Sequence, residues 1–159
     1  MENISKPILQ ALVIADHVYQ DVTSGKMIVC GIFHNIHHAP SESAPDPDSK
    51  KNNLFASQNG YTVGSPFAYI SLTDLCGMHS FNLRYVNLAT EKVYFDFRLD
   101  IECKDPLQHI DVRVALPPLP MDIGVYALEL LWKANEPLGA FRICVQESKR
   151  EAKHDNDRD

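Results

Sequence analysis

Hydrophobic and polar residues alternate with a period of two along much of the chain. The clearest run is VYFDFRLDIE at positions 93–102, where apolar side chains occupy every odd position. Side chains of a strand point alternately to the two faces of its sheet. The run therefore predicts a strand with one face in the core and one in water. Positions 110–116 repeat the pattern, with Ile110, Val112, Val114 and Leu116 directed inward.

Further strands are predicted where apolar, β-branched and aromatic runs lie between turn residues. Together with 92–103 and 108–116, these strands are 8–19, 27–37, 67–74, 79–88, 123–133 and 138–147. Gly25 lies between the first two of these runs and can supply the positive φ of a hairpin loop. No long segment has the 3.6-residue period of a helix. The predicted fold class is all-β, an antiparallel β-sandwich of about eight strands with an immunoglobulin-like or related topology.

Residues 38–66 interrupt this alternation of apolar and polar residues. They contain several prolines and serines and the polar run DSKKNN at 48–53. Loops of this length without regular structure are uncommon in compact domains. We expect a floppy insertion at 38–66, and a functional lid is the alternative. The predicted organisation is a single domain over 1–147, followed by a polar tail at 148–159.

Composition and charge narrow the class of protein. The chain has 159 residues, of which 45% are hydrophobic and 23% are charged, and its net charge is −6. These values are ordinary for one globular domain and argue against a disordered chain. Nucleic-acid-binding proteins usually carry a basic face, but here basic residues cluster only in the tail, at Lys149, Arg150 and Lys153. We therefore expect no nucleic-acid partner.

The first residues, MENISKPILQALVIADHVY, do not form the pattern of a signal peptide. Glu2 precedes the first lysine, and Asp16 and His17 interrupt the apolar run. No stretch approaches the roughly 18 apolar residues of a membrane-spanning helix. We expect a cytoplasmic protein that does not bind a membrane.

The four cysteines are Cys30, Cys76, Cys103 and Cys144, and they form no CxxC motif. Their spacing fits no compact disulfide framework. Three of them, Cys30, Cys103 and Cys144, lie in apolar runs, so we interpret them as small buried hydrophobic residues. Zinc or redox chemistry is the alternative.

The segment DIGVYAL at 122–128 resembles the D-x-G-x-Y-x-C start of a late strand in immunoglobulin-type sandwiches. In those domains the tyrosine hydroxyl bonds back to the backbone at the corner of the sheet. Leu128 occupies the cysteine position, and Trp132, the one tryptophan, does not lie in an early strand. The resemblance implies a sandwich without the inter-sheet disulfide, and a structural role for Tyr126.

Both ends of the chain also resemble a family of short bacterial proteins known only as a domain of unknown function. At the N-terminal end the similarity lies in ADHVY at 15–19, Asp21, TSGK at 23–26 and VCGIF at 29–33. At the C-terminal end it lies in GVY at 124–126, Leu128, Leu130, LG at 138–139 and Val145. The 38–66 loop is longer than such a family implies. The resemblance implies a fold and a bacterial or phage-like origin, and it implies no activity.

The strongest metal-ligating pattern is Cys30-x3-His34-x2-His37-His38. On a strand, Cys30 and His34 share a face but lie about 13 Å apart, which is four steps of about 3.3 Å. His37 and His38 point to opposite faces. A zinc ion needs its ligands at about 2 Å, so a metal site here would require a bend after Ile36 or ligands from the loop. We predict no metal site.

A second polar group consists of acidic residues on the outward faces of two predicted strands. Arginines are interleaved with them, so we interpret the group as a solvated, salt-bridged sheet surface. The alternative is a site for calcium or for a cationic partner. The acidic residues are Asp96, Asp100, Glu102 and Asp111, and the arginines are Arg98 and Arg113.

Asp16 lies on a largely apolar strand, where a carboxylate needs hydrogen bonds or a cation. We expect Lys26 or the backbone amides of the hairpin to supply them, and a ligand contact is the alternative. The sequence CGMH at 76–79 is the nearest approach to a cysteine–histidine pair, and we interpret it as a turn. No G-x-S-x-G, phosphate-binding loop or dinucleotide fingerprint occurs. We therefore assign no catalytic, cofactor-binding or metal-binding residue.

These observations favour a non-catalytic binding or assembly module whose partner is another protein or a second copy of the chain. Pairing through an edge strand is the simplest form of such assembly. Two alternatives remain. One is an enzyme or a metal-dependent ligand site under the 38–66 loop, and the other is a small-ligand carrier or sensor.

Overall fold

A computed structural model describes residues 5–38, 54–57, 60–63, 66–133 and 135–148, and these parts form eleven strands and no helix. The all-β fold class predicted from the sequence is confirmed, with more strands than the eight expected. The strands are β1 (Ile8–Gln20), β2 (Met27–Ile32), β3 (Asn35–His38), β4 (Leu54–Ser57), β5 (Gly60–Val63), β6 (Phe67–Thr73), β7 (Gly77–Asn87), β8 (Val93–Cys103), β9 (Ile110–Ala115), β10 (Gly124–Trp132) and β11 (Glu136–Glu147).

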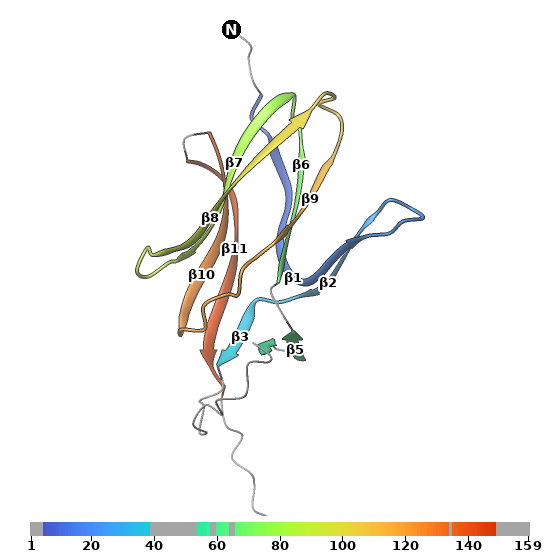
Figure 1. Ribbon diagram of the computed structural model, residues 1–159. Helices are drawn as coiled ribbons and strands as arrows, with labels where there is room; N and C mark the ends of the chain where they lie inside the picture. Colours follow the sequence, from blue (N-terminus) through green and yellow to red (C-terminus); the bar gives the residue numbers. More distant parts are fainter. Residues whose placement is uncertain (1–4, 39–53, 58–59, 64–65, 134, 149–159) are drawn as a thin grey trace, which may run out of the picture.

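The strands form two sheets that face each other (Figure 1). The four-stranded sheet has the order β2-β1-β6-β9 and is antiparallel throughout. The body of the other sheet is β3-β11-β10-β7-β8, and the short hairpin β4–β5 extends it beyond β3. Its neighbouring strands are antiparallel except β3 and β11, which are parallel.

The prediction of a single strand over 27–37 is wrong. The chain leaves the four-stranded sheet after β2 and enters the other sheet at β3. Gly31 has a φ of +73°, a left-handed conformation that interrupts the regular strand, and Phe33 is buried at the crossing. The backbone amide of Cys144 then donates to the carbonyl of His34 at 2.8 Å and joins the chain to β11.

The expectation of a structureless loop over 38–66 is also wrong, because β4 and β5 lie within that range and pair with each other. The part of the proposed flexible insertion at 39–53 lies outside the described residues. The hairpin loop between β1 and β2 agrees with its prediction. Gly25 has a φ of +71°, and its amide donates to the carbonyl of Asp21 at 2.8 Å.

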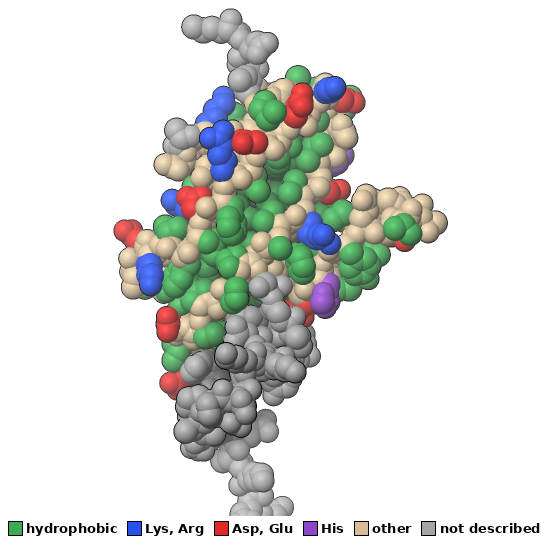
Figure 2. All heavy atoms as spheres, viewed as in Figure 1, with side chains coloured by type: hydrophobic (Ala, Val, Ile, Leu, Met, Phe, Trp, Pro, Cys, Tyr) green, Lys and Arg blue, Asp and Glu red, His purple; other side chains and the backbone are tan. Residues whose placement is uncertain are grey.

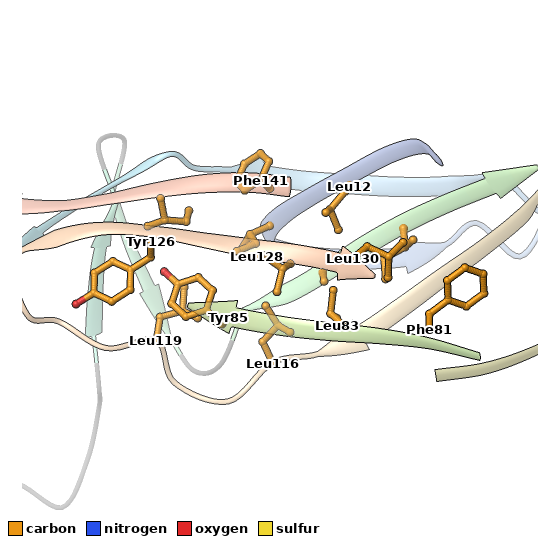
Figure 3. Close-up of a cluster of buried hydrophobic side chains, with 14 of the residues drawn as sticks. Leu12, Phe81, Leu83, Tyr85, Leu116, Leu119, Tyr126, Leu128, Leu130 and Phe141 are labelled. Carbon is orange, nitrogen blue, oxygen red and sulfur yellow. The ribbon is translucent and has the colours of Figure 1, made fainter. Parts of the chain in front are cut away.

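The core lies between the inner faces of the two sheets (Figure 3). Alternate residues of β1 and β6 meet alternate residues of β7, β10 and β11, as the period of two requires. Leu116 and Leu119, from the segment between β9 and β10, complete the packing. Fully buried members include Ile14, Ile70, Leu72, Phe81, Leu83, Tyr85, Tyr126, Leu128, Leu130 and Ile143.

The predicted inward residues are buried to different degrees. Tyr126, Leu128 and Leu130 are buried, as predicted, because β10 lies between two other strands. The inward residues of β8 and β9 pack against the core but are only half-buried, because both strands are sheet edges. Val93, at the start of β8, is 46% exposed, so its predicted burial is wrong. The register between β7 and β8 shifts at Tyr85 and Val86, opposite this end of β8.

Tyr126 makes the backbone contact that its sequence motif predicts. Its hydroxyl donates to the carbonyl oxygen of Asp122 at 2.8 Å, and its ring stacks on Tyr85 with the ring centres 5.4 Å apart. The hydrogen bond holds the segment before β10 against the end of the sheet.

Replacing Tyr126 with phenylalanine removes this hydrogen bond and keeps the stacked ring. We expect Tyr126→Phe to lower the free energy of unfolding by about 0.5–1.5 kcal/mol. Leu128→Ala, which opens a cavity in the core, should lower it by about 2–5 kcal/mol. Urea denaturation measures both. Equal stability of Tyr126→Phe and the natural protein would show that the corner bond contributes nothing.

Candidate functional site

The predicted metal-ligand pattern is divided between the two sheets. Cys30 is exposed on β2, whereas His37 lies on β3 in the other sheet. His34, at the crossing, stacks on Phe141 with ring centres 4.7 Å apart. The side chain of His38 lies outside the described part of the chain. Within that part, no three histidine, cysteine or acidic side chains converge in a way that could hold a metal ion.

The four cysteines are free. Cys103 is buried, as predicted, and Cys144 is half-buried. Cys30 is exposed, so its predicted burial is wrong. It lies on the β1–β2 hairpin, which projects from the body of the molecule (Figure 1), and β2 is a sheet edge with β1 as its neighbour.

The predicted acidic surface is two separate surfaces. Asp96, Asp100 and Glu102 lie on β8 in one sheet, and Asp111 lies on β9 in the other. Arg98 pairs with Asp100 on its own strand, with Nε 3.0 Å from Oδ1.

The second arginine of the predicted salt-bridged surface has a different role. The guanidinium of Arg113 donates to the carbonyl oxygen of Val18 at 3.0 Å and lies 5.4 Å from the ring centre of Phe67. Asp111 instead accepts a hydrogen bond from the hydroxyl of Tyr69 at 2.9 Å. Arg113 therefore links β9 to the part of β1 that forms the hairpin with β2.

Asp16 lies directly against the backbone of Gly31. A Cβ added to Gly31 would come within 2.5 Å of Oδ2 of Asp16, so the absence of a side chain at position 31 makes room for the carboxylate. Oδ1 of Asp16 is buried without a hydrogen-bond partner among the described residues. The expected partnership with Lys26 or with the hairpin amides is therefore wrong for this oxygen. Burial raises the pKa of the Asp16 carboxyl, and the smaller effect of His17 lowers it.

A buried histidine and the tryptophan form a polar contact in the core that the sequence analysis missed. Nε1 of Trp132 donates to Nδ1 of His79 at 3.2 Å, and Nε2 of His79 lies 3.0 Å from the carbonyl oxygen of Cys76. Nδ1 must therefore be the unprotonated nitrogen, and Nε2 donates to Cys76. His79 and Trp132 are both nearly inaccessible, at 3% and 4% exposure. No local signal could reveal this pair, because the two residues are distant in sequence.

The Cys76–His79 segment differs from its interpretation as a turn. β7 begins at Gly77, whose φ is +83°, and His79 already points into the core. His79 contacts the backbone of Cys76, and the thiol of Cys76 is exposed. The geometry gives His79 a structural role at the start of β7.

Two open hollows lie on the surface of the described residues. One is on the outer face of the larger sheet, where Arg84 and Glu129 form an ion pair at 2.6 Å beside Val86 and Val93. The other is lined by His37, Gln146, Glu147 and Ser148. Arg84 and Glu129 in the first hollow already satisfy each other.

The most extensive unpartnered feature of the described chain is the pair of edge strands β8 and β9. Each pairs on one side only, with β7 and β6 respectively. The inward side chains of the two strands form a half-buried row, which we call the apolar seam. Figure 2 shows hydrophobic side chains running as a band over this region. The seam consists of Phe95, Phe97, Leu99 and Ile101 on β8 and Ile110, Val112 and Val114 on β9.

Comparison with protein-family models, with curated proteins and with solved structures found no significant match to this chain. In the described residues, no helix is long and apolar enough to cross a membrane.

The partly buried carboxylate of Asp16 predicts a pH-dependent stability. The pKa of Asp16 is higher in the folded chain than in the unfolded chain. The contribution of Asp16 to the free energy of unfolding is therefore fully present below the ordinary carboxyl pKa of 3.8, and it is lost as the pH rises through the raised pKa. We therefore expect Asp16→Asn to be more stable than the natural protein at pH 7, with a difference that shrinks toward pH 3.

Thermal melts across this pH range provide the measurement, and Asp21→Asn is the matched control. Hydrogen bonds from Ser24 lower the pKa of Asp21, so this substitution should change stability in the opposite direction at pH 7. A loss of stability in Asp16→Asn at neutral pH would show that the carboxylate has a stabilising partner.

The Trp132–His79 contact predicts a coupled loss of stability. Trp132→Phe leaves Nδ1 of His79 buried without a donor, which should cost about 1–3 kcal/mol besides the lost packing. His79→Leu removes the other partner, and the double variant should cost less than the sum of the two single costs. Denaturant unfolding of all four proteins gives the coupling. Additive costs would mean that the hydrogen bond contributes no stability.

Proposed function

We propose that this chain is a non-catalytic binding or assembly module that acts through its sheet edges. The observation that carries the proposal is the apolar seam. Side chains on the inner faces of β8 and β9 belong to the core by direction but remain half-accessible. An edge strand with open backbone groups and a neighbouring apolar face is suited to pairing with a further strand.

Self-association is the simplest form of this function. A strand added beside β8 gains backbone hydrogen bonds along an edge of eleven residues. Its inward side chains at the same time cover the half-buried aromatic residues of the seam. Burial of apolar surface is the main source of affinity in such contacts, and the backbone pairing gives their direction.

We also infer an immunoglobulin-like topology. Its support is the strand order, because β1, β6 and β9 lie together in one sheet as strands A, B and E do. β7, β10 and β11 lie together in the other sheet as strands C, F and G do. The position of Tyr126 near the start of β10 fits the tyrosine corner of strand F.

A cytoplasmic location forms part of the proposal. Its support is the four free thiols, two of them exposed, which suit a reducing compartment.

The proposal predicts reversible self-association that increases with protein concentration. Sedimentation velocity over about a hundredfold range of concentration should show a shift from monomer to a discrete larger species. Size-exclusion chromatography with light scattering should give the same mass for that species. A chain that remains monomeric at every concentration would contradict the proposal.

A further inference from the structure

The centre of β8, residues 95–99, is complementary to itself when it is read in the opposite direction. In an antiparallel pair of identical strands related by a two-fold axis at Phe97, Asp96 lies opposite Arg98. This opposite-charge pair occurs twice by symmetry. The complementary stretch ends at Phe95, because the register shift between β7 and β8 turns Tyr94 toward the core, where its ring packs against Tyr126.

The inward side chains match in the same register. Phe95 lies opposite Leu99, and Phe97 lies opposite its own copy. Phe95, Phe97 and Leu99 belong to the face of β8 that packs toward the core, and all three are half-buried in the single chain. One arrangement therefore satisfies both faces of the strand.

Neighbouring registers are excluded by charge. A two-fold axis at Asp96 places two copies of Asp96 opposite each other. An axis at Arg98 places Arg98 opposite its own copy and Asp96 opposite Asp100. Like charges directly opposite each other destabilise strand pairs. A shift by one residue would place the charged face against the apolar face.

The edge of β8 is open to such pairing. In the described chain β8 has β7 as its one neighbour, and it lies at the margin of its sheet (Figure 1). The contacts that its charged side chains make within one chain can be replaced by contacts with a second copy. Arg98 is 69% and Asp100 48% exposed in their ion pair, and Asp96 accepts one hydrogen bond from Asn82 at 2.8 Å. Exposed pairs of this kind contribute little to stability, so regrouping them costs little.

The edge strand β9 of the smaller sheet is not self-complementary in this way. β9 has six residues and carries Asp111 and Arg113, which are already engaged by Tyr69 and by the carbonyl of Val18. β2 carries no charged residue, so nothing on it selects a register.

We propose that β8 is a homodimer interface, in which two copies pair antiparallel about Phe97 and join their larger sheets edge to edge into one continuous sheet. This inference rests on the proposed function and specifies its partner as a second copy of the chain. A two-fold contact of this kind closes on itself and leaves no further β8 edge, so it gives a dimer and not a fibre.

Charge reversal at the two central positions tests the interface. In Arg98→Asp, two carboxylates face each other across the axis on both sides, and in Asp96→Arg two guanidinium groups do so. We expect each variant to dissociate at least about tenfold more readily than the natural protein in sedimentation velocity. Arg142→Asp, on the exposed face of β11 and separated from β8 by β10 and β7, is the matched control and should dimerise normally.

Mixing the two variants separates a lost interface from a lost fold. A copy with Asp96→Arg carries arginine at 96 and 98, and a copy with Arg98→Asp carries aspartate at both positions. Each pair across the axis of the mixed dimer is therefore oppositely charged again. We expect the equimolar mixture to form heterodimers with affinity close to that of the natural homodimer, and the double variant to dimerise alone.

Three results would overturn the inference. Dimerisation of Arg98→Asp as strong as that of the natural chain would place the interface on another surface and leave the proposed function intact. Failure of the folded variants to associate on mixing would show that the register is wrong. A natural chain that stays monomeric would overturn this inference together with the proposed function.

Discussion

The burial of inward side chains between two facing sheets is the constraint on which the rest of the structure depends. Tyr85, Leu128 and Ile143 have no accessible surface and come from three strands of the larger sheet. They meet Ile14 and Ile70 from the smaller sheet. Because apolar burial is the dominant favourable term in folding, each strand must keep the register that points these residues inward. The crossings of the chain between the sheets follow from this requirement.

The same constraint creates the unpaired edges. A sheet that does not close into a barrel leaves two edge strands, and their inward side chains have a neighbouring strand on one side only. The half-burial of Phe97 on β8 and of Val112 on β9 is the direct consequence. Charged residues on the outward face of β8 keep such an edge from random association, because most registers bring like charges together. The one register that matches them can then act as a selective contact.

A few polar groups are also buried in the interior. The bond from Trp132 to His79 fixes the imidazole at the start of β7, and the bond from Tyr126 to Asp122 fixes the segment before β10. Asp16 differs from both, since one of its oxygens is buried without a partner among the described residues. The first two contacts fix the positions of side chains in the core. The Asp16 carboxylate instead lowers the stability of the fold, and it fits there because Gly31 has no side chain.

The sequence by itself determined most of the strands, most of the directions of their side chains and the Tyr126 corner, because these depend on residues adjacent along the chain. It failed over 27–37 and could not show that Asp100 and Asp111 lie in different sheets. The pairing of distant strands decides sheet membership, and a period of two carries no information about it. Likewise, the alternation in β8 was evident, but only the tertiary structure showed that β8 is an edge. Edge position is the property that leaves Phe97 half-covered and gives the charges of that strand a role in the candidate interface.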